Sequence, residues 1–193
     1  MPDLSRPELY ALLLAHPQGL RLCQLNLASL DLGGLNLDHC DFSGSSLRDC
    51  NLARARARAA CFRGADLRGS NWQRAEVEGA LFQRVQAANA DFSNAELKET
   101  VWDAAHLTDI SFADADLTRS RFVGALIARV DFGGARLDGC RFQGSRLTDT
   151  SFLEAIFELI YIDTEQRSFF LNADVAPHSL QLTDVQEDYY GNM

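Results

Sequence analysis

The chain has 193 residues, 47% of them hydrophobic, and a formal net charge of −9. This length suits one domain with its own core, and no early apolar run is long enough to cross a bilayer. The five cysteines include no Cys-x-x-Cys pair, which argues against a disulfide scaffold. We therefore expect reduced thiols, a cytoplasmic location and no membrane association.

The negative charge is concentrated at the C-terminus. Residues 20–157 hold 18 acidic and 16 basic side chains, whereas residues 158–193 hold seven acidic side chains and Arg167 as their single base. The body of the protein is therefore nearly neutral, and the acidity belongs to the tail.

A helix is predicted over residues 5–15. Ser5 and Glu8 have the spacing of a capping box, and Pro7 falls in the first turn. Leu9, Leu12 and Leu13 form an apolar stripe. We expect residues 1–19 to form a helical cap over the structure that follows.

An apolar residue recurs at every fifth position from residue 22 to residue 157. All 28 positions are apolar, and they include both tryptophans and ten of the twelve phenylalanines. The aromatic members are Phe42, Phe62, Trp72, Phe82, Phe92, Trp102, Phe112, Phe122, Phe132, Phe142, Phe152 and Phe157. A five-residue step keeps one face in neither a helix nor a flat strand, so each pentapeptide must contain a corner. The chain therefore coils around its own side chains as a solenoid.

The number of sides follows from a longer period. Between Phe112 and Phe152 the apolar position alternates between Phe and Leu or Ile, which requires an even number of sides in each coil. Four sides and a 20-residue coil place the large rings on two opposite sides and leucines on the other two. The sequence therefore predicts an all-β, quadrilateral β-helix of about seven coils over residues 20–162, with short helical caps.

A C-terminal cap and acidic tail are predicted over residues 163–193. The repeat continues through Ile160 and Ile162 and is lost by Thr164, and residues 165–172 suit a short helix. Phe169, Phe170 and Leu171 exceed what a small cap needs. They are candidate dimerisation residues, and the alternative is that both rings seal the last coil.

Several segments resemble the A(D/N)LxG signature of the pentapeptide repeat family. They are Ala65-Asp66-Leu67-Arg68-Gly69, Ala90-Asp91-Phe92-Ser93-Asn94 and Ala115-Asp116-Leu117. The resemblance covers about 140 of the 193 residues and implies a right-handed quadrilateral β-helix. The best understood members protect bacterial DNA gyrase and topoisomerase IV from quinolones or natural poisons, as dimers whose rod resembles duplex DNA.

The resemblance implies a type II topoisomerase, in the first instance DNA gyrase, as the partner of a homodimer formed through the C-terminus. The chain departs from those members in its nearly neutral body, and no loops interrupt its repeats. The alternative function is a scaffold or adaptor that docks another protein without imitating DNA.

A polar column on the third side is the candidate partner-binding face. It precedes the apolar residue of each coil and contains no positive charge. Its members are Asp31, Asn51, Asn71, Asp91, Ser111 and Asp131. These side chains either mimic phosphates or satisfy backbone groups at the corners, as short polar side chains do in turns. The fourth side instead predicts a solvated ladder of opposite charges.

We expect no catalytic residue, no metal site and no cofactor, hence no enzyme activity. A filled rod has no cavity for convergent titratable groups, and the four histidines (His16, His39, His106, His178) are scattered. The run Ala53-Arg54-Ala55-Arg56-Ala57-Arg58 holds three arginines without interleaved aromatic residues. We therefore expect solvated charge there and no direct nucleic-acid binding.

Overall fold

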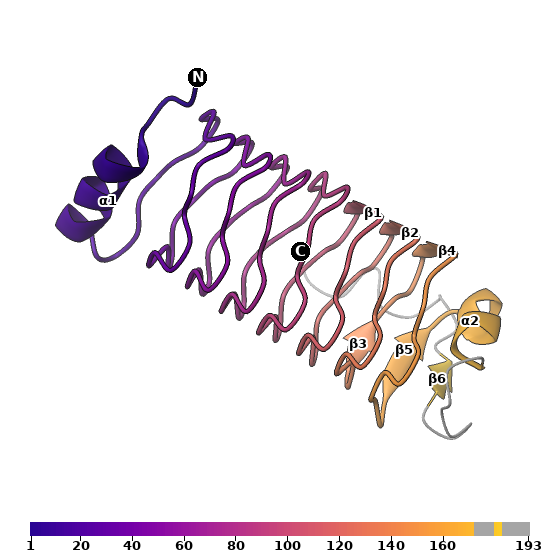
Figure 1. The fold of residues 1–193 in the computed structure, drawn as a ribbon. Helices are drawn as coiled ribbons and strands as arrows, with labels where there is room; N and C mark the ends of the chain where they lie inside the picture. Colours follow the sequence, from indigo (N-terminus) through magenta and orange to yellow (C-terminus); the bar gives the residue numbers. More distant parts are fainter. Residues whose placement is uncertain (172–179, 183–193) are drawn as a thin grey trace, which may run out of the picture.

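The computed structural model describes residues 1–171 and 180–182, without the side chains of Leu171 and residues 180–182. The chain forms one rod of stacked coils (Figure 1). Helix α1, Arg6–Ala15, lies at one end of the rod. The 3-10 helix η1, Thr164–Gln166, and helix α2, Arg167–Leu171, lie at the other.

Parallel bridges between residues 20 apart join each coil to the next. One coil supplies four of them, which are Arg21↔Asp41, Asn26↔Ser46, Asp31↔Asn51 and Asn36↔Arg56. Each coil therefore has four sides, as the alternation of rings and leucines predicts. The first to fourth sides are residues 20–24, 25–29, 30–34 and 35–39 and the pentapeptides that follow each at 20-residue intervals.

The longer bridged segments form two small parallel sheets. On the second side, β1 (His106–Thr108) pairs with β2 (Leu126–Ala128), which pairs with β4 (Arg146–Thr148). On the first side, β3 (Cys140–Arg141) pairs with β5 (Ile160–Ile162), which pairs with β6 (Leu180–Leu182). Both sheets extend the 20-residue register of the single bridges.

The core is the column of apolar residues inside the coils. All 28 predicted positions are buried. Rings stack along two sides, for example Phe62 on Phe82 with centroids 5.0 Å apart. The two stacks meet edge to face, as in the Trp72–Phe82 contact at 5.8 Å and 82°. Stacked and edge-to-face rings interact favourably beyond their burial, so the aromatic columns stabilise the rod along its length.

Each corner contains a residue with positive φ. From residue 24 to residue 154, the residue two places after the inward apolar residue always has φ between 49° and 72°, and 18 of these residues are not glycine. This left-handed conformation is costly for residues with a Cβ. It persists here because hydrogen bonds hold the turn on both sides. The N–H of the positive-φ residue bonds to the neighbouring coil, as in Arg54 N–H to Gln73 O at 2.9 Å, and the next N–H closes the turn within the same coil, as in Ala55 N–H to Leu52 O at 3.0 Å.

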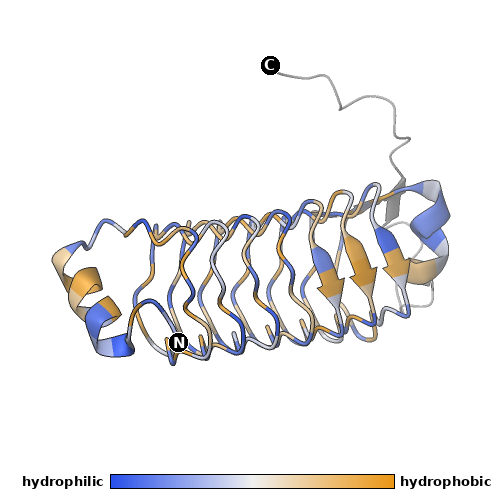
Figure 2. Ribbon diagram, turned by 90° about the horizontal axis from the view of Figure 1, so that it is seen from above, coloured by the Kyte–Doolittle hydropathy of each residue, from blue (hydrophilic) through white to orange (hydrophobic). Residues whose placement is uncertain are grey.

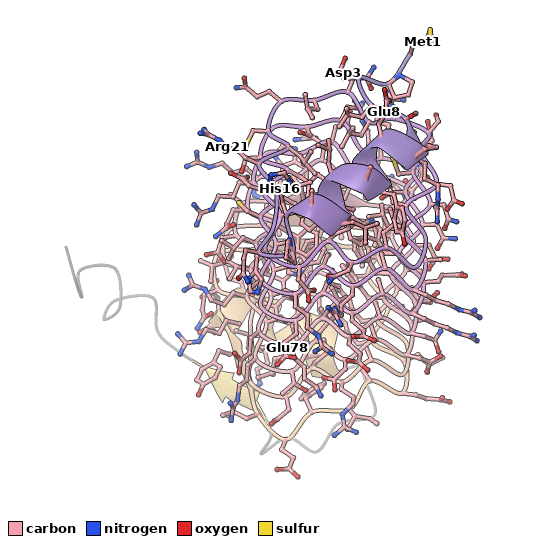
Figure 3. The ribbon with its side chains drawn as sticks, turned by 90° about the vertical axis from the view of Figure 1, so that its left-hand side faces the viewer. Met1, Asp3, Glu8, His16, Arg21 and Glu78 are labelled. Carbon is pink, nitrogen blue, oxygen red and sulfur yellow. The ribbon has the colours of Figure 1, made fainter. Side chains whose placement is uncertain are left out.

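The N-terminal cap forms largely as predicted. Ser5 is the N-cap of α1, and its backbone N–H donates to Glu8 Oε2 at 2.8 Å, completing the capping box. Figure 3 shows α1 lying across the end of the rod. Leu9 is buried in the core and Leu13 packs against it, but Leu12 is 38% exposed. The predicted stripe is therefore wrong at Leu12, because one short helix over a flat coil buries only a narrow line of side chains.

In the C-terminal cap, a side chain takes the place of a backbone donor at the end of the second side. Gln166 in η1 is buried, and its Nε2 donates to the carbonyls of Phe142 and Ser145, both at 2.7 Å. The carbonyl of Ser145 corresponds to one that accepts a backbone N–H in earlier coils, as Ser45 O does from Asp66 N. Figure 2 shows the hydropathy of the rod and of both caps. The tail, residues 172–179 and 183–193, lies outside the described residues.

Candidate functional site

The predicted third-side column is one continuous row on the rod. Bridges join its members in register, from Asp31↔Asn51 through Asp131↔Ser151. In every member a side-chain oxygen accepts a hydrogen bond from the backbone N–H two residues later, such as Gly33 N–H to Asp31 Oδ1 at 3.1 Å. The column therefore caps turns, which is the structural role that the sequence left open.

Turn capping occupies only part of each carboxylate. Asp131 Oδ1 accepts the N–H of Gly133 at 2.9 Å, and no bond to its Oδ2 is found among the described residues. Asp91 uses Oδ1 for Ser93, and its Oδ2 accepts from Gln73 Nε2 at 2.6 Å. An aspartate in this row can therefore cap its turn and still direct charge outward.

Asp31 differs from the other aspartates of the row because it is paired. Arg6 of α1 contacts its Oδ2 at 3.0 Å. The N–H of Gly33 lowers the pKa of the Asp31 carboxyl, and Arg6 and Asn51 act in the same direction. Asp31 therefore fastens the N-terminal cap, and its charge is compensated within the chain.

The uncompensated charge of the third side lies in its later coils. We call the set Asp91, Asp114, Asp131 and Glu154 the acidic half-face. Within the described residues none of the four forms an ion pair. The pentapeptides that hold them, residues 90–94, 110–114, 130–134 and 150–154, contain no Lys or Arg. Negative charge on this face is therefore available to a partner.

Sequence reasoning missed Asp114 and Glu154. Both occupy the positive-φ corner position, with φ of 57° and 59°, and both are exposed. The signal that would have found them is the third-side corner row, taken at 20-residue intervals beside the predicted column. Asn51, Asn71 and Ser111 of the prediction are uncharged turn caps.

The fourth side is a ladder of opposite charges, as predicted. Arg58 contacts Glu76 at 2.8 Å. Asp116 contacts Lys98 at 3.4 Å and Arg136 at 3.9 Å. Exposed pairs of this kind contribute little stability, but they compensate part of the negative charge of this side, whereas the acidic half-face has no such pairs among the described residues.

The C-terminal aromatic residues divide between two roles. Phe170 is fully buried, with its ring centroid 4.4 Å from that of Phe152 and 5.6 Å from that of Phe142. It seals the last coil, because the open end of the ring columns would otherwise meet water. Phe169 is partly buried against the core. The side chain of Leu171 lies outside the described residues, and pairing through Phe169 and Leu171 stays a prediction.

No group of three or more His, Cys, Asp or Glu side chains is placed to hold a metal ion in the described part of the chain. Burial raises the pKa of the Cys50 thiol to about 11 and that of Cys140 further still, so both behave as small core residues. The three described histidines, His16, His39 and His106, are exposed and lie on different elements.

The fold and the repeat define a solenoid of pentapeptides, and the family follows from the sequence itself. The profile described as Pentapeptide repeats matches in eight copies, over residues 26–64, 60–98, 90–127 and 125–159. The chain belongs to the pentapeptide repeat family, whose members form right-handed β-helices. This confirms the resemblance noted in the sequence.

The chain is similar to several solved structures, among them that of an antibiotic resistance protein. A trypsin-treated form of QnrB1, a plasmid-mediated fluoroquinolone resistance protein, is 21% identical over 79% of this chain and 86% of its own, with a TM-score of 0.47. Rfr23 from the cyanobacterium Cyanothece 51142 is 16% identical over 77% and 97%, with a TM-score of 0.40. No curated protein matches the chain.

Proposed function

We propose that this protein binds a type II topoisomerase, DNA gyrase in the first instance, in place of DNA and protects it from a topoisomerase poison. The observation that carries the proposal is the acidic half-face, a row of carboxylates without ion pairs on a straight rod. Such a face presents the charge that a DNA-binding surface is built to receive.

The dimensions of the rod support this role. Coils stacked at about 4.8 Å make residues 20–159 roughly 34 Å long. Four carboxylates over four coils give about one charge per 5 Å, against one per about 3.4 Å for a single DNA strand. The acidic half-face therefore imitates part of one DNA strand. Because the other sides carry charges of both signs, the imitation of DNA is confined to this face.

We further propose that two rods join through their C-terminal ends, which would give a length of about 70 Å, near 20 base pairs at about 3.4 Å each. Phe169, which is only partly buried, is the candidate for this contact. Phe169→Asp should convert a dimer to a monomer in light scattering, because burial of a charged side chain at an apolar interface is costly. Leu126→Asp, in β2 on the second side and one coil further from this end, is the matched control because Leu126 is 42% exposed. An unchanged dimer mass for Phe169→Asp would contradict this assembly.

We propose that the protein acts by binding alone, in the cytoplasm, where its partner works. Its interior is filled by the apolar column, and the described histidines do not converge. Among the described residues no helix has the length and apolar character needed to span a bilayer.

A second candidate function is that of an adaptor that docks another protein through an apolar patch. The observation that favours it is the exposure of large apolar side chains at both ends of the rod. Tyr10 and Leu14 of α1 are 51% and 66% exposed, and Leu153 and Ile156 of the last coil are 68% and 56% exposed. This partner would bind the ends of the rod, whereas a topoisomerase would bind along the third side.

The deciding experiment titrates the purified protein into gyrase supercoiling reactions, with and without a poison, and scores cleaved and supercoiled plasmid together. Protection predicts restored supercoiling and less trapped cleavage as the protein is added. No effect at large molar excess, across several classes of poison, would contradict the proposal and favour the adaptor.

A further inference from the structure

One edge of the rod changes the sign of its charge along its length. We call the last residues of successive third-side pentapeptides the corner row. Its members from the second coil onward are Arg54, Arg74, Asn94, Asp114, Gly134 and Glu154. All have φ between 57° and 65°, so they occupy equivalent corners. The row is therefore basic in its earlier coils and acidic in its later ones.

The two arginines of the corner row are available to a partner. Their neighbours in sequence are compensated, because Arg56 pairs with Asp38 and Arg58 pairs with Glu76, both at 2.8 Å. Arg54 and Arg74 are exposed, and the ion pairs of the described residues include neither. Of the three arginines in residues 53–58, only Arg54 has no ion pair among the described residues, and Arg74 in the next coil is the second such arginine.

Arg54 and Arg74 also line a groove. It has a volume of about 400 Å³ and is completed by Ala53, Gln73 and Asn94. The arginines are one coil apart, about 4.8 Å along the rod. Two arginine side chains from adjacent coils, with the side chain of Asn94 beside them, can donate hydrogen bonds to the oxygens of one carboxylate.

The position of this groove limits what binds there. Asn51, Asn71 and Asp91 run beside it, and the acidic half-face begins within two coils. A long polyanion lying along the third side would meet these carboxylates, so the groove suits a compact acidic group. A partner that contacts the whole side must therefore carry a basic surface next to a carboxylate cluster.

We propose that the Arg54–Arg74 groove binds a carboxylate cluster of the same partner whose basic surface receives the acidic half-face, and that this fixes the direction in which the rod lies. This inference rests on the proposed function. Enzymes that cleave nucleic acids with divalent metal ions hold carboxylates beside their phosphate-binding surface, so a topoisomerase has the required pairing of charges. A purely negative face would accept the rod in either direction.

The test uses a substitution for which the two explanations predict opposite changes in the affinity for gyrase. If only overall acidity mattered, loss of two positive charges would strengthen binding to a basic surface. If the groove holds partner carboxylates, Arg54→Gln with Arg74→Gln should raise the Kd for gyrase about tenfold or more at physiological salt. Gln24 occupies the same kind of corner with φ of 59°, so glutamine is compatible with this turn.

The matched control is Arg63→Gln with Arg84→Gln, which removes the same charge from the first side. These arginines are exposed and form no ion pair among the described residues. The control should bind as the unmodified protein does, or more tightly. Equal or tighter binding by the Arg54 and Arg74 variant would overturn the inference and leave the proposed function standing. Absence of gyrase binding by the unmodified protein would overturn both.

Discussion

Neutralising the acidic half-face is expected to abolish protection of gyrase and leave the fold intact. The variant combines Asp91→Asn, Asp114→Asn, Asp131→Asn and Glu154→Gln. Asn51 and Asn71 cap the equivalent turns of their own coils with their Oδ1 atoms. Asparagine can therefore replace aspartate in this row without loss of the capping hydrogen bond. At roughly 0.5 kcal/mol or more for each interfacial charge, we expect the Kd for gyrase to rise at least about 30-fold.

The control for this prediction removes four charges elsewhere. It combines Asp49→Asn, Glu78→Gln, Glu96→Gln and Asp149→Asn. The four native residues lie on the second and fourth sides, and none of them forms an ion pair in the described part of the chain. Affinity should be measured as a function of salt, since fewer interfacial charges give a shallower dependence. Equal losses in the two variants would show that net charge matters and the third side does not.

Truncation of one ring in the aromatic columns is expected to have the largest effect on stability. Trp102 is fully buried, stacks on Phe82 with centroids 4.1 Å apart, and meets Phe92 and Phe112 edge to face at 5.2 and 5.4 Å. Trp102→Ala leaves a cavity among rings that cannot close over it. We expect a loss of about 3–5 kcal/mol in the free energy of unfolding.

Guanidinium unfolding followed by circular dichroism, with Trp72 as the remaining fluorescent reporter, measures this loss. Trp102→Phe is the matched control, because phenylalanine occupies the equivalent place in the coils on either side, at Phe82 and Phe122. It gives up the bond from Trp102 Nε1 to Thr100 Oγ1 at 2.9 Å but keeps the stack. It should cost less than half as much as the alanine variant. An unchanged unfolding midpoint for Trp102→Ala would contradict the packing argument.

The site was harder to predict than the fold, for a reason visible in the third-side column. An aspartate there can cap its turn or present charge to a partner, and the sequence looks the same in both cases. Hydrogen bonds separate them, since Asp131 caps its turn with one oxygen whereas Asp31 also pairs with Arg6. The sequence likewise does not show whether Arg54 or Arg56 is ion-paired. In the structure Arg56 contacts Asp38, and the ion pairs of the described residues do not include Arg54.

The sequence by itself determined the 20-residue coil, the two aromatic columns and the N-terminal cap. The coil and the columns follow from an apolar position that recurs 28 times at five-residue spacing, so the pattern is visible without any long-range contact. The cap follows from Ser5 and Glu8, which lie three residues apart in the chain. Tertiary structure decided which charges are compensated, because eight of the nine ion pairs among the described residues join residues 18 to 25 positions apart, and long side chains can reach several partners. It also decided that Phe170 closes the rod, since only the stacked coils create the apolar end that this ring covers.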